Sequence, residues 1–135
     1  MVITRVVAMR LWNDIFGENT IWARDCFGTW IHKDDFGNTT NMRRRPNGDG
    51  KEYVYGWTVD HIMPISKGGK DTWNNFEPMH YINNNKKGGD ISFKIENVSY
   101  QVIKCNLCPG YGYGIKNQQT NQRIDWKGVQ QRWYI

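Results

Sequence analysis

The spacing of apolar residues predicts short elements in the first third of the chain. Apolar side chains recur at helical spacing through residues 4–16, and Gly17 then offers a C-terminal stop, so we predict a first helix there. Residues 20–38 hold short apolar segments that are separated by Gly28 and followed by a turn-forming Asp-Asp-Phe-Gly stretch. This pattern predicts a small pair of strands.

The middle of the chain predicts a loop, two strands and a short helix. Residues 39–52 are polar, include three consecutive arginines and a proline, and predict a solvated loop. Residues 53–62 alternate loosely and are rich in aromatic and β-branched types, which predicts a strand, and residues 76–79 predict another. The segment YINNNKKGG then has helix-compatible positions that end at Gly88.

The last third alternates in the manner of β-hairpins. ISFKIENVSYQVIKC alternates around Glu96 and Asn97, and QRIDWKGVQQRWYI favours a second pair that turns at Lys127 and Gly128. No internal repeat or linker is visible, and 135 residues suit one domain with a modest core better than two. We therefore expect a single α+β domain.

A polar and basic composition favours an anionic partner. The chain is 39% hydrophobic and 14% aromatic with a mean hydropathy of -0.75, which indicates a small core under a very polar surface. Its 18 Lys and Arg residues against 13 Asp and Glu leave a net charge of +5. Such a balance suits nucleic acid, although a well-solvated surface would have the same charge.

Cysteine usage and the absence of long apolar runs favour the cytoplasm. Cys26, Cys105 and Cys108 cannot all pair with one another, which argues for a reducing compartment. The first 17 residues lack the apolar core and cleavage site of an export signal. No run approaches the ~18 apolar residues that a membrane span needs, so we expect neither export nor a membrane.

The stretch YVYGWTVDHIMPISKGG ends an apolar run on two polar side chains, Asp60 and His61. Asn75 follows 14 residues after His61, and Asn84 follows 9 residues after Asn75. Neighbouring side chains on a regular strand point to opposite faces, so the strand should bend or end here if both are to serve one site.

With this order and spacing, and with Pro64 and paired Gly68 and Gly69 in the loop, about 35 residues resemble the HNH endonucleases. The resemblance implies a ββα-metal core over about residues 53–89. An N-terminal helix and small strands would occupy residues 1–52, and a β-rich C-terminal extension residues 90–135. It also implies a bacterial or phage enzyme that hydrolyses DNA to 5′-phosphate and 3′-hydroxyl ends.

The chemistry of phosphodiester hydrolysis gives these residues roles. A neutral imidazole, with an unperturbed pKa of about 6.5, is a suitable base near pH 7, so His61 would activate water. Mg²⁺ prefers oxygen ligands and keeps several waters, so Asp60 and Asn84 would bind it, and Mn²⁺ or another divalent ion could substitute. The resemblance implies that Asn75 supports the loop and thereby places the base.

Two neighbours of Asn84 leave alternatives open. Asn83 is an alternative metal ligand, and His80 shares a helix face with Asn84 and would be structural or would face the substrate. Family members with a structural zinc carry a Cys-x-x-Cys pair where this chain has His80 and Asn83, and asparagine is a poor zinc ligand. We therefore expect no structural zinc, although Cys105 and Cys108 could supply half of such a site.

Affinity for double-stranded DNA should come from basic residues in or beside the loops of the motif, because Lys and Arg neutralise phosphates. The candidates are Arg43, Arg44, Arg45, Lys67, Lys86 and Lys87. The C-terminal extension could contact bases, form a dimer or complete the core. Two rival functions are a non-catalytic nucleic-acid-binding module and a zinc-stabilised interaction domain. The sequence leaves open the recognition site, one-strand or two-strand cleavage, a monomer or a homodimer, and the biological role.

Overall fold

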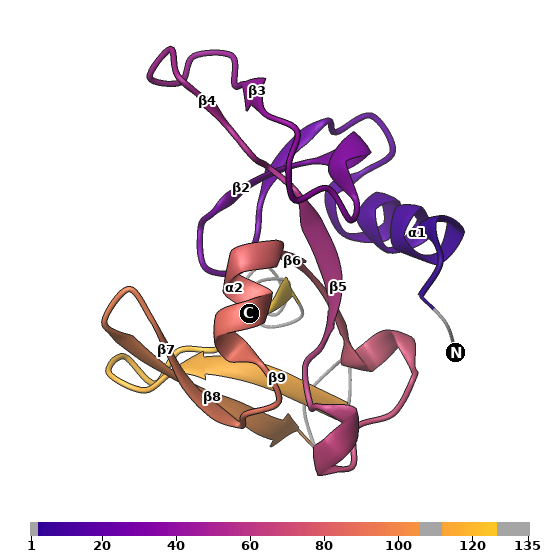
Figure 1. Ribbon diagram of the computed structural model, residues 1–135. Coiled ribbons are helices and arrows are strands. Elements are labelled where there is room, and N and C mark those ends of the chain that lie inside the picture. The colour runs from indigo at the N-terminus through magenta and orange to yellow at the C-terminus, as the bar shows by residue number, and fades with distance from the viewer. Residues whose placement is uncertain (1–2, 106–111, 127–135) are drawn as a thin grey trace.

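The chain folds into a mixed α+β structure with small antiparallel sheets (Figure 1). The structure is a computed structural model that describes residues 3–105 and 112–126. In these ranges the helices are α1 (Arg5–Phe16) and α2 (Tyr81–Lys87). The strands are β1 (Trp22–Arg24), β2 (Trp30–His32), β3 (Arg43–Arg44), β4 (Glu52–Tyr53), β5 (Trp57–His61), β6 (Phe76–His80), β7 (Ser92–Ile95), β8 (Val98–Cys105) and β9 (Gly112–Asn117).

Helix α1 begins and ends where the sequence predicts. The Thr4 hydroxyl accepts a hydrogen bond from the Val7 backbone N–H at 3.3 Å and caps the first turn. Gly17, with φ of 100°, ends the helix. The buried face of α1 consists of Ala8, Leu11 and Trp12.

The expected solvated loop of residues 39–52 contains part of a short hairpin. Strands β3 and β4 pair antiparallel through two residue pairs, Arg43 with Tyr53 and Arg44 with Glu52, and all four residues are exposed. Alternation of apolar and polar residues cannot mark a ladder of this length, which is why the sequence predicts only a loop. The hairpin projects from the upper end of the molecule (Figure 1).

Strands β5 and β6 form the central hairpin. Their register pairs Trp57 with His80, Asp60 with Glu77 and His61 with Phe76. Residues directly opposite each other share a face, so Asp60 and Glu77 lie on one face and His61 and Phe76 on the other. Strand β5 ends at His61, as expected, but its pairing with β6 continues through that residue, so the side chains of Asp60 and His61 still leave the sheet on opposite faces.

Two hydrophobic clusters cover the two faces of this hairpin. The first joins α1 to the Trp57 face and contains Ala8, Leu11, Trp12, Ala23, Ile31, Trp57, Val59 and Phe76. The second joins Met79 and Ile62 to the three-stranded β7–β8–β9 sheet and contains Phe93, Ile95, Tyr100, Val102 and Ile115. Helix α2 contacts β5, β6 and β7 and lies across the hairpin in Figure 1.

The predicted β7–β8 hairpin and the end of α2 agree with the structure, whereas residues 122–126, predicted to begin a second strand pair, form only an isolated bridge between Arg123 and Lys116, and strand β9 was not predicted. Glu96 and Asn97 turn the β7–β8 hairpin with φ of 50° and 67°, and Gly88 ends α2. The predicted turn at Lys127 and Gly128 lies outside the described residues. In the part of the chain that is described, neither helix has the length and apolar character to cross a bilayer.

Gly56, just before β5, packs its backbone against another segment. A Cβ atom built on Gly56 would overlap the carbonyl oxygen of Asn38. Because that neighbour is backbone rather than a movable side chain, the position admits only glycine. The close approach fixes where β5 begins.

Candidate active site

Asp60 lies buried under α2 at the end of β5. It is 4% exposed, and its Oδ1 lies 3.2 Å from Nζ of Lys87. Its Oδ2 is buried and has no hydrogen-bond partner among the described residues. Burial raises the pKa of Asp60 to about 6, and the charges of Lys87 and His61 offset only part of that effect. Within the described part of the chain, this carboxylate thus has one paired oxygen and one without a partner.

His61 is held from the loop that follows β5. Its Nε2 lies 2.6 Å from Oδ1 of Asp71, and its ring meets Phe76 edge-on at 5.3 Å between centroids. The imidazole side chain is 24% exposed, and no described residue bonds its Nδ1. With Nε2–H donated to the carboxylate, Nδ1 carries the lone pair that can accept a proton.

Asn75 closes the loop between β5 and β6. The side chain is 1% exposed, accepts a hydrogen bond from the Met63 N–H at 2.8 Å, and donates to the Met63 and Lys70 carbonyls at 3.1 and 3.0 Å. At Gly69 a Cβ atom would overlap the Met63 carbonyl oxygen, so the loop has no room for a side chain there. The amide of Asn75 thus fixes the path of the loop that carries Asp71.

The two candidate ligands on α2 point to different neighbours. Asn84 is half-buried and donates from Nδ2 to the Thr58 hydroxyl at 2.6 Å. Thr58 and Asp60 share a face of β5, so Asn84 lies over the same face as the free carboxylate oxygen. Asn83 is buried and donates instead to Asp25 at 3.0 Å and Thr29 at 2.9 Å.

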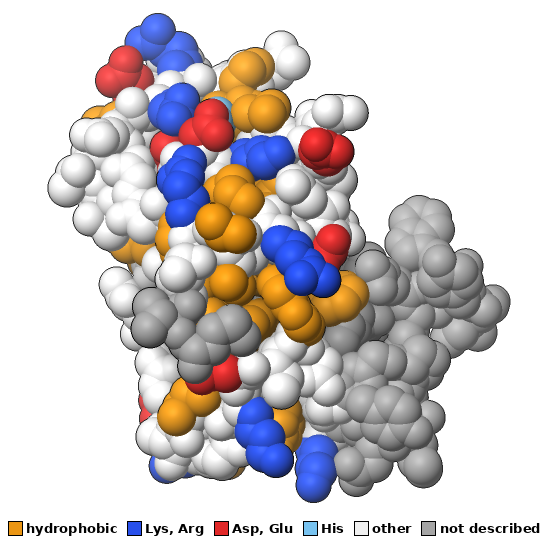
Figure 2. All heavy atoms as spheres, turned by 90° about the vertical axis from the view of Figure 1, so that its right-hand side faces the viewer, with side chains coloured by type: hydrophobic (Ala, Val, Ile, Leu, Met, Phe, Trp, Pro, Cys, Tyr) orange, Lys and Arg blue, Asp and Glu red, His pale blue; other side chains and the backbone are white. Residues whose placement is uncertain are grey.

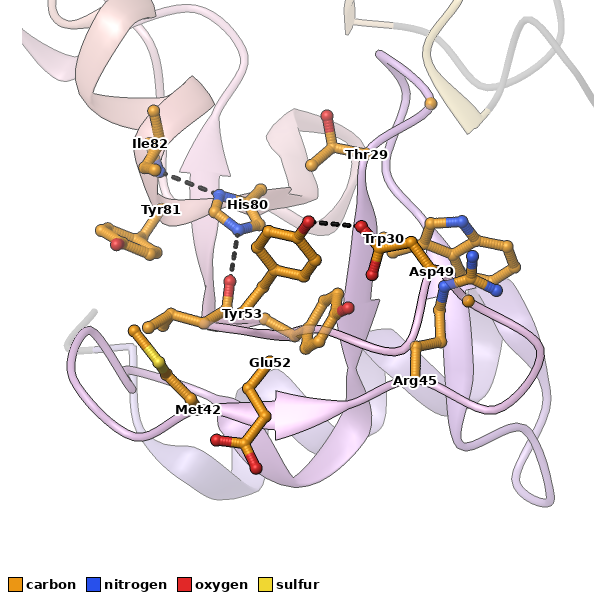
Figure 3. A pocket seen from close by; sticks show the side chains of 14 residues that line it. Thr29, Trp30, Met42, Arg45, Asp49, Glu52, Tyr53, His80, Tyr81 and Ile82 are labelled. Carbon is orange, nitrogen blue, oxygen red and sulfur yellow. Dashed lines mark hydrogen bonds between the residues drawn. The ribbon is translucent and has the colours of Figure 1, made fainter.

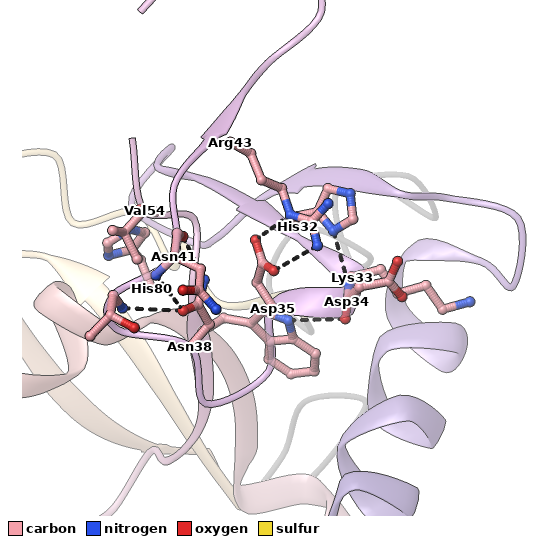
Figure 4. Close-up of polar contacts among 11 residues, drawn as sticks. His32, Lys33, Asp34, Asp35, Asn38, Asn41, Arg43, Val54 and His80 are labelled. Carbon is pink, nitrogen blue, oxygen red and sulfur yellow. Dashed lines mark hydrogen bonds and ion pairs between the residues drawn. The ribbon is translucent and has the colours of Figure 1, made fainter. Parts of the chain in front are cut away.

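His80 caps the start of α2. Its Nδ1 accepts from the Ile82 N–H at 3.2 Å, its Nε2 donates to the Val54 carbonyl at 3.0 Å, and its ring stacks on Tyr81 at 4.9 Å (Figures 3 and 4). Both ring nitrogens are therefore used in holding the helix start. These bonds place His80 at the opposite end of β5 from His61, next to Trp57.

The oxygen atoms that Asp60 and Asn84 offer are of the kind that suits a hard divalent ion. An unpartnered carboxylate oxygen on Asp60 beside the Asn84 amide offers two oxygen ligands, which leaves the remaining positions of a magnesium ion for water and phosphate. No group of three or more His, Cys, Asp or Glu side chains is arranged to hold a metal among the described residues. Burial, with the charges of Glu77 and Asp25, raises the pKa of Cys26 well above its usual value, so its thiol stays protonated. Cys108 and the side chain of Cys105 lie outside the described part of the chain.

The candidate DNA-binding residues differ in their surroundings. Arg43 forms a two-pronged contact with the buried Asp35, at 2.8 and 2.9 Å (Figure 4), and Arg44 donates to the Gly50 carbonyl at 2.8 Å. Lys67 and Lys86 are exposed. On the face shown in Figure 2, Lys and Arg side chains are spread among apolar ones rather than gathered into one patch.

The structure corrects the expectation for Lys87. The side chain is 0% exposed, and its ammonium faces Asp60 and the His61 carbonyl oxygen rather than solvent. A lysine so enclosed cannot touch a DNA phosphate. Its helix position, three residues after Asn84, turns it into the same interior face.

A hollow of about 570 Å³ opens between the β3–β4 hairpin and the start of α2 (Figure 3). The guanidinium groups of Arg45 and Arg24 lie over the Trp30 ring at 4.3 and 4.6 Å from its centroid. Aromatic side chains supply much of the lining, which includes Trp30, Tyr53, Tyr55, His80 and Tyr81. Rings beside arginines form a surface on which nucleobases can stack.

These features define a small α+β domain in which α2 covers the Asp60 face of a strand that ends in an Asp-His pair. The HNH endonuclease family matches residues 47–90, the segment that holds β4, β5, β6 and α2, and the chain therefore contains an HNH endonuclease domain. This match suggests a nuclease that hydrolyses phosphodiester bonds of nucleic acid, and HNH nucleases generally use a divalent metal. No curated protein and no solved structure matches the chain.

Sequence reasoning missed two residues of the site. Asp71 sits 10 residues after His61 in a glycine-containing loop, and its contact depends on how that loop folds back. Lys87 was predicted to contact DNA because it lies beside the loops of the motif, and its pairing with Asp60 was not foreseen. Its three-residue spacing from Asn84 was the signal that both could face the same strand.

Proposed function

We propose that this protein is a metal-dependent DNA endonuclease in which His61 activates water and Asp60 and Asn84 hold one divalent ion. The observation that carries the proposal is the arrangement of two side chains at the end of β5. There a buried carboxylate with an unpartnered oxygen adjoins an imidazole whose Nε2 is fixed by Asp71. The products would be 5′-phosphate and 3′-hydroxyl ends.

The residues of the chain have separate tasks in this reaction. His61 accepts the proton of the attacking water at Nδ1, and the Asp71 carboxylate stabilises the imidazolium that forms. Asn75 holds the loop so that Asp71 stays in reach of the imidazole. Mg²⁺ bound between Asp60 and Asn84 would act as a Lewis acid toward phosphate oxygens.

Contacts to the DNA backbone are proposed at three cations around the motif, of which Lys67 and Lys86 are exposed and Arg45 is half-buried. Arg45, Lys67 and Lys86 have no carboxylate within salt-bridge distance among the described residues, in contrast to Arg43. Arg45 also lies against Trp30 at the hollow, where a base can stack while the guanidinium faces a phosphate. We place the activity in the cytoplasm, consistent with an odd number of cysteines.

Cleavage of supercoiled plasmid tests the proposal. Wild-type protein with Mg²⁺ or Mn²⁺ should nick or linearise the plasmid, and EDTA or His61→Ala should abolish cleavage while DNA binding persists. Metal-independent cleavage, or full activity of the His61→Ala variant, would refute the mechanism. Salt-sensitive binding without cleavage under any metal would instead favour a non-catalytic binding module.

A further inference from the structure

Lys87, the last residue of α2, is a fully buried lysine with two polar contacts. Its Nζ lies 3.2 Å from the Asp60 carboxylate and 3.2 Å from the His61 carbonyl oxygen. The ammonium also lies 5.8 Å from the centroid of the Phe93 ring. Lysine is almost never fully buried unless it is paired, so a partner must explain this position.

The fold explains why a cation is needed at this place. The β5–β6 register sets Asp60 directly opposite Glu77, and these side chains are 4% and 2% exposed. Like charges opposite each other on a sheet repel, and a buried carboxylate without a compensating charge is costly. Helix α2 brings Lys87 onto this face of the hairpin.

The ammonium of Lys87 contacts both residues of the Asp-His pair. It contacts the side chain of Asp60 and the backbone of His61, so it fixes the candidate metal ligand and the strand end that carries the candidate base. Asn84 lies on the same helix face, three residues earlier, and reaches Thr58 on the same strand. Helix α2 thus places the amide of Asn84 and the ammonium of Lys87 against the C-terminal half of β5.

We propose that Lys87 is the internal counterion and positioning residue of the site, holding the Asp60 carboxylate and the His61 backbone in place before any metal binds. The reference to metal rests on the proposed function, whereas the pairing itself does not. A divalent ion at Asp60 would add positive charge near the same carboxylate. Without Lys87, that ion would become the main compensation for the buried charge.

Thermal unfolding in EDTA tests the pairing through a double-mutant cycle. Lys87→Met should lower the Tm by on the order of 10 °C, because it leaves the buried Asp60 carboxylate without its counterion. Asp60→Asn should also lower the Tm, because it leaves the buried Lys87 ammonium without its carboxylate partner. The double variant Asp60→Asn/Lys87→Met should be more stable than Lys87→Met alone, since the two losses share one cause.

Controls separate this role from general packing. Lys86→Met, at the exposed neighbouring position, should leave the Tm nearly unchanged, and Lys87→Arg should retain more stability than Lys87→Met. Additive losses in the cycle would overturn the proposal. So would a double variant that fails to fold along with Lys87→Met, because removal of both charges should relieve the defect.

Metal titration supplies a readout that packing alone would not move. Mg²⁺ should raise the Tm of Lys87→Met more than that of wild type, and the midpoint should fall to lower Mg²⁺ concentration because the competing cation is gone. An equal Mg²⁺ shift in both proteins would contradict the counterion role of Lys87. If the EDTA cycle shows coupling while no plasmid is cut, the pairing of Lys87 with Asp60 stands and the nuclease proposal fails. If plasmid is cut while the two losses in Tm are additive, the nuclease proposal stands and the pairing fails.

Discussion

At the scale of single residues, the site depends on partners that the Asp-His motif does not contain. The imidazole of His61 is oriented by a carboxylate from the following loop, and the carboxylate of Asp60 by an ammonium from the helix. Each partner restricts one side chain of the motif to one direction. The geometry of the pair therefore depends on residues outside the Asp-His dipeptide.

Asp71→Asn tests the orienting contact on His61. We expect kcat to fall about 10- to 100-fold with KM little changed, because the amide neither fixes the tautomer nor stabilises the imidazolium. Steady-state cleavage of a labelled duplex measures both constants. Asp14→Asn, an exposed carboxylate on α1, is the matched control, and an equal loss in both variants would contradict the role of Asp71.

His32 provides a pH test away from the site. Burial lowers the pKa of His32, the nearby Arg43 lowers it further, and its Nδ1 accepts a hydrogen bond from the Asp34 N–H at 3.0 Å. Because the folded-state pKa lies below the unfolded value of about 6.5, the unfolded chain binds more protons. The stabilisation is thus complete above that unfolded pKa and is lost as pH falls through the folded pKa.

Melting curves across this window check the prediction. The Tm of wild type should drop more steeply from neutral to acidic pH than that of His32→Asn, whose amide oxygen can still accept the Asp34 N–H but does not titrate. Parallel pH profiles for the two proteins would show that His32 makes no such contribution.

At the scale of elements, the sequence predicts the hairpin and helix of the site well, and its limits have physical causes. Periodicity located α1, β5, β6 and α2 within a few residues, because each buries a definite face. The β3–β4 hairpin was not predicted, because two exposed residue pairs produce no alternation of apolar and polar residues in the sequence. Which of Asn83 and Asn84 faces β5 depends on the angle at which α2 crosses the hairpin, and that angle is set by tertiary packing.

The two asparagines of α2 should respond differently to substitution. Asn84→Ala should raise the Mg²⁺ concentration needed for cleavage and change the Tm little. Asn83→Ala should cost about 1–3 kcal/mol of folding free energy, because the buried Asp25 and the half-buried Thr29 each lose a hydrogen-bond donor. Chemical unfolding and metal titration of both variants measure the contrast, and a reversal would make Asn83 the ligand.

The β3–β4 hairpin should contribute to DNA affinity through Arg45. Arg45→Ala should weaken binding to all duplexes and reduce the slope of log K against log salt by about 1. Fluorescence anisotropy of a labelled duplex in EDTA at several salt concentrations measures this slope. Lys94→Ala, an exposed lysine on β7, serves as the control, and an equal effect there would mean that charge alone matters.

At the scale of the whole molecule, the family match ends where the core continues. The match stops at residue 90, yet the cluster under α2 combines Met79 with side chains of β7, β8 and β9. The Trp126 indole donates to the Phe76 carbonyl at 3.1 Å, and its backbone N–H contacts Glu77 at 3.2 Å. The C-terminal extension therefore completes the central hairpin up to this tryptophan.

A fragment of residues 47–90 should not fold alone, because both faces of its hairpin would lose their cover. Far-UV circular dichroism during heating should show no cooperative transition for the fragment and a cooperative one for the full chain. A sigmoidal melt of the fragment would show that the extension and α1 are dispensable.

Two glycines, one just before β5 and one in the loop after it, have a consequence for how the sequence could change in evolution. Gly56 and Gly69 each pack against a backbone carbonyl that leaves no room for a side chain, and neither takes part in the proposed reaction. Descendants of this chain that lost their cutting activity would be free to change Asp60 or His61 but would still need both glycines. In such lineages the trace of ancestry would persist in the two residues that have no side chain.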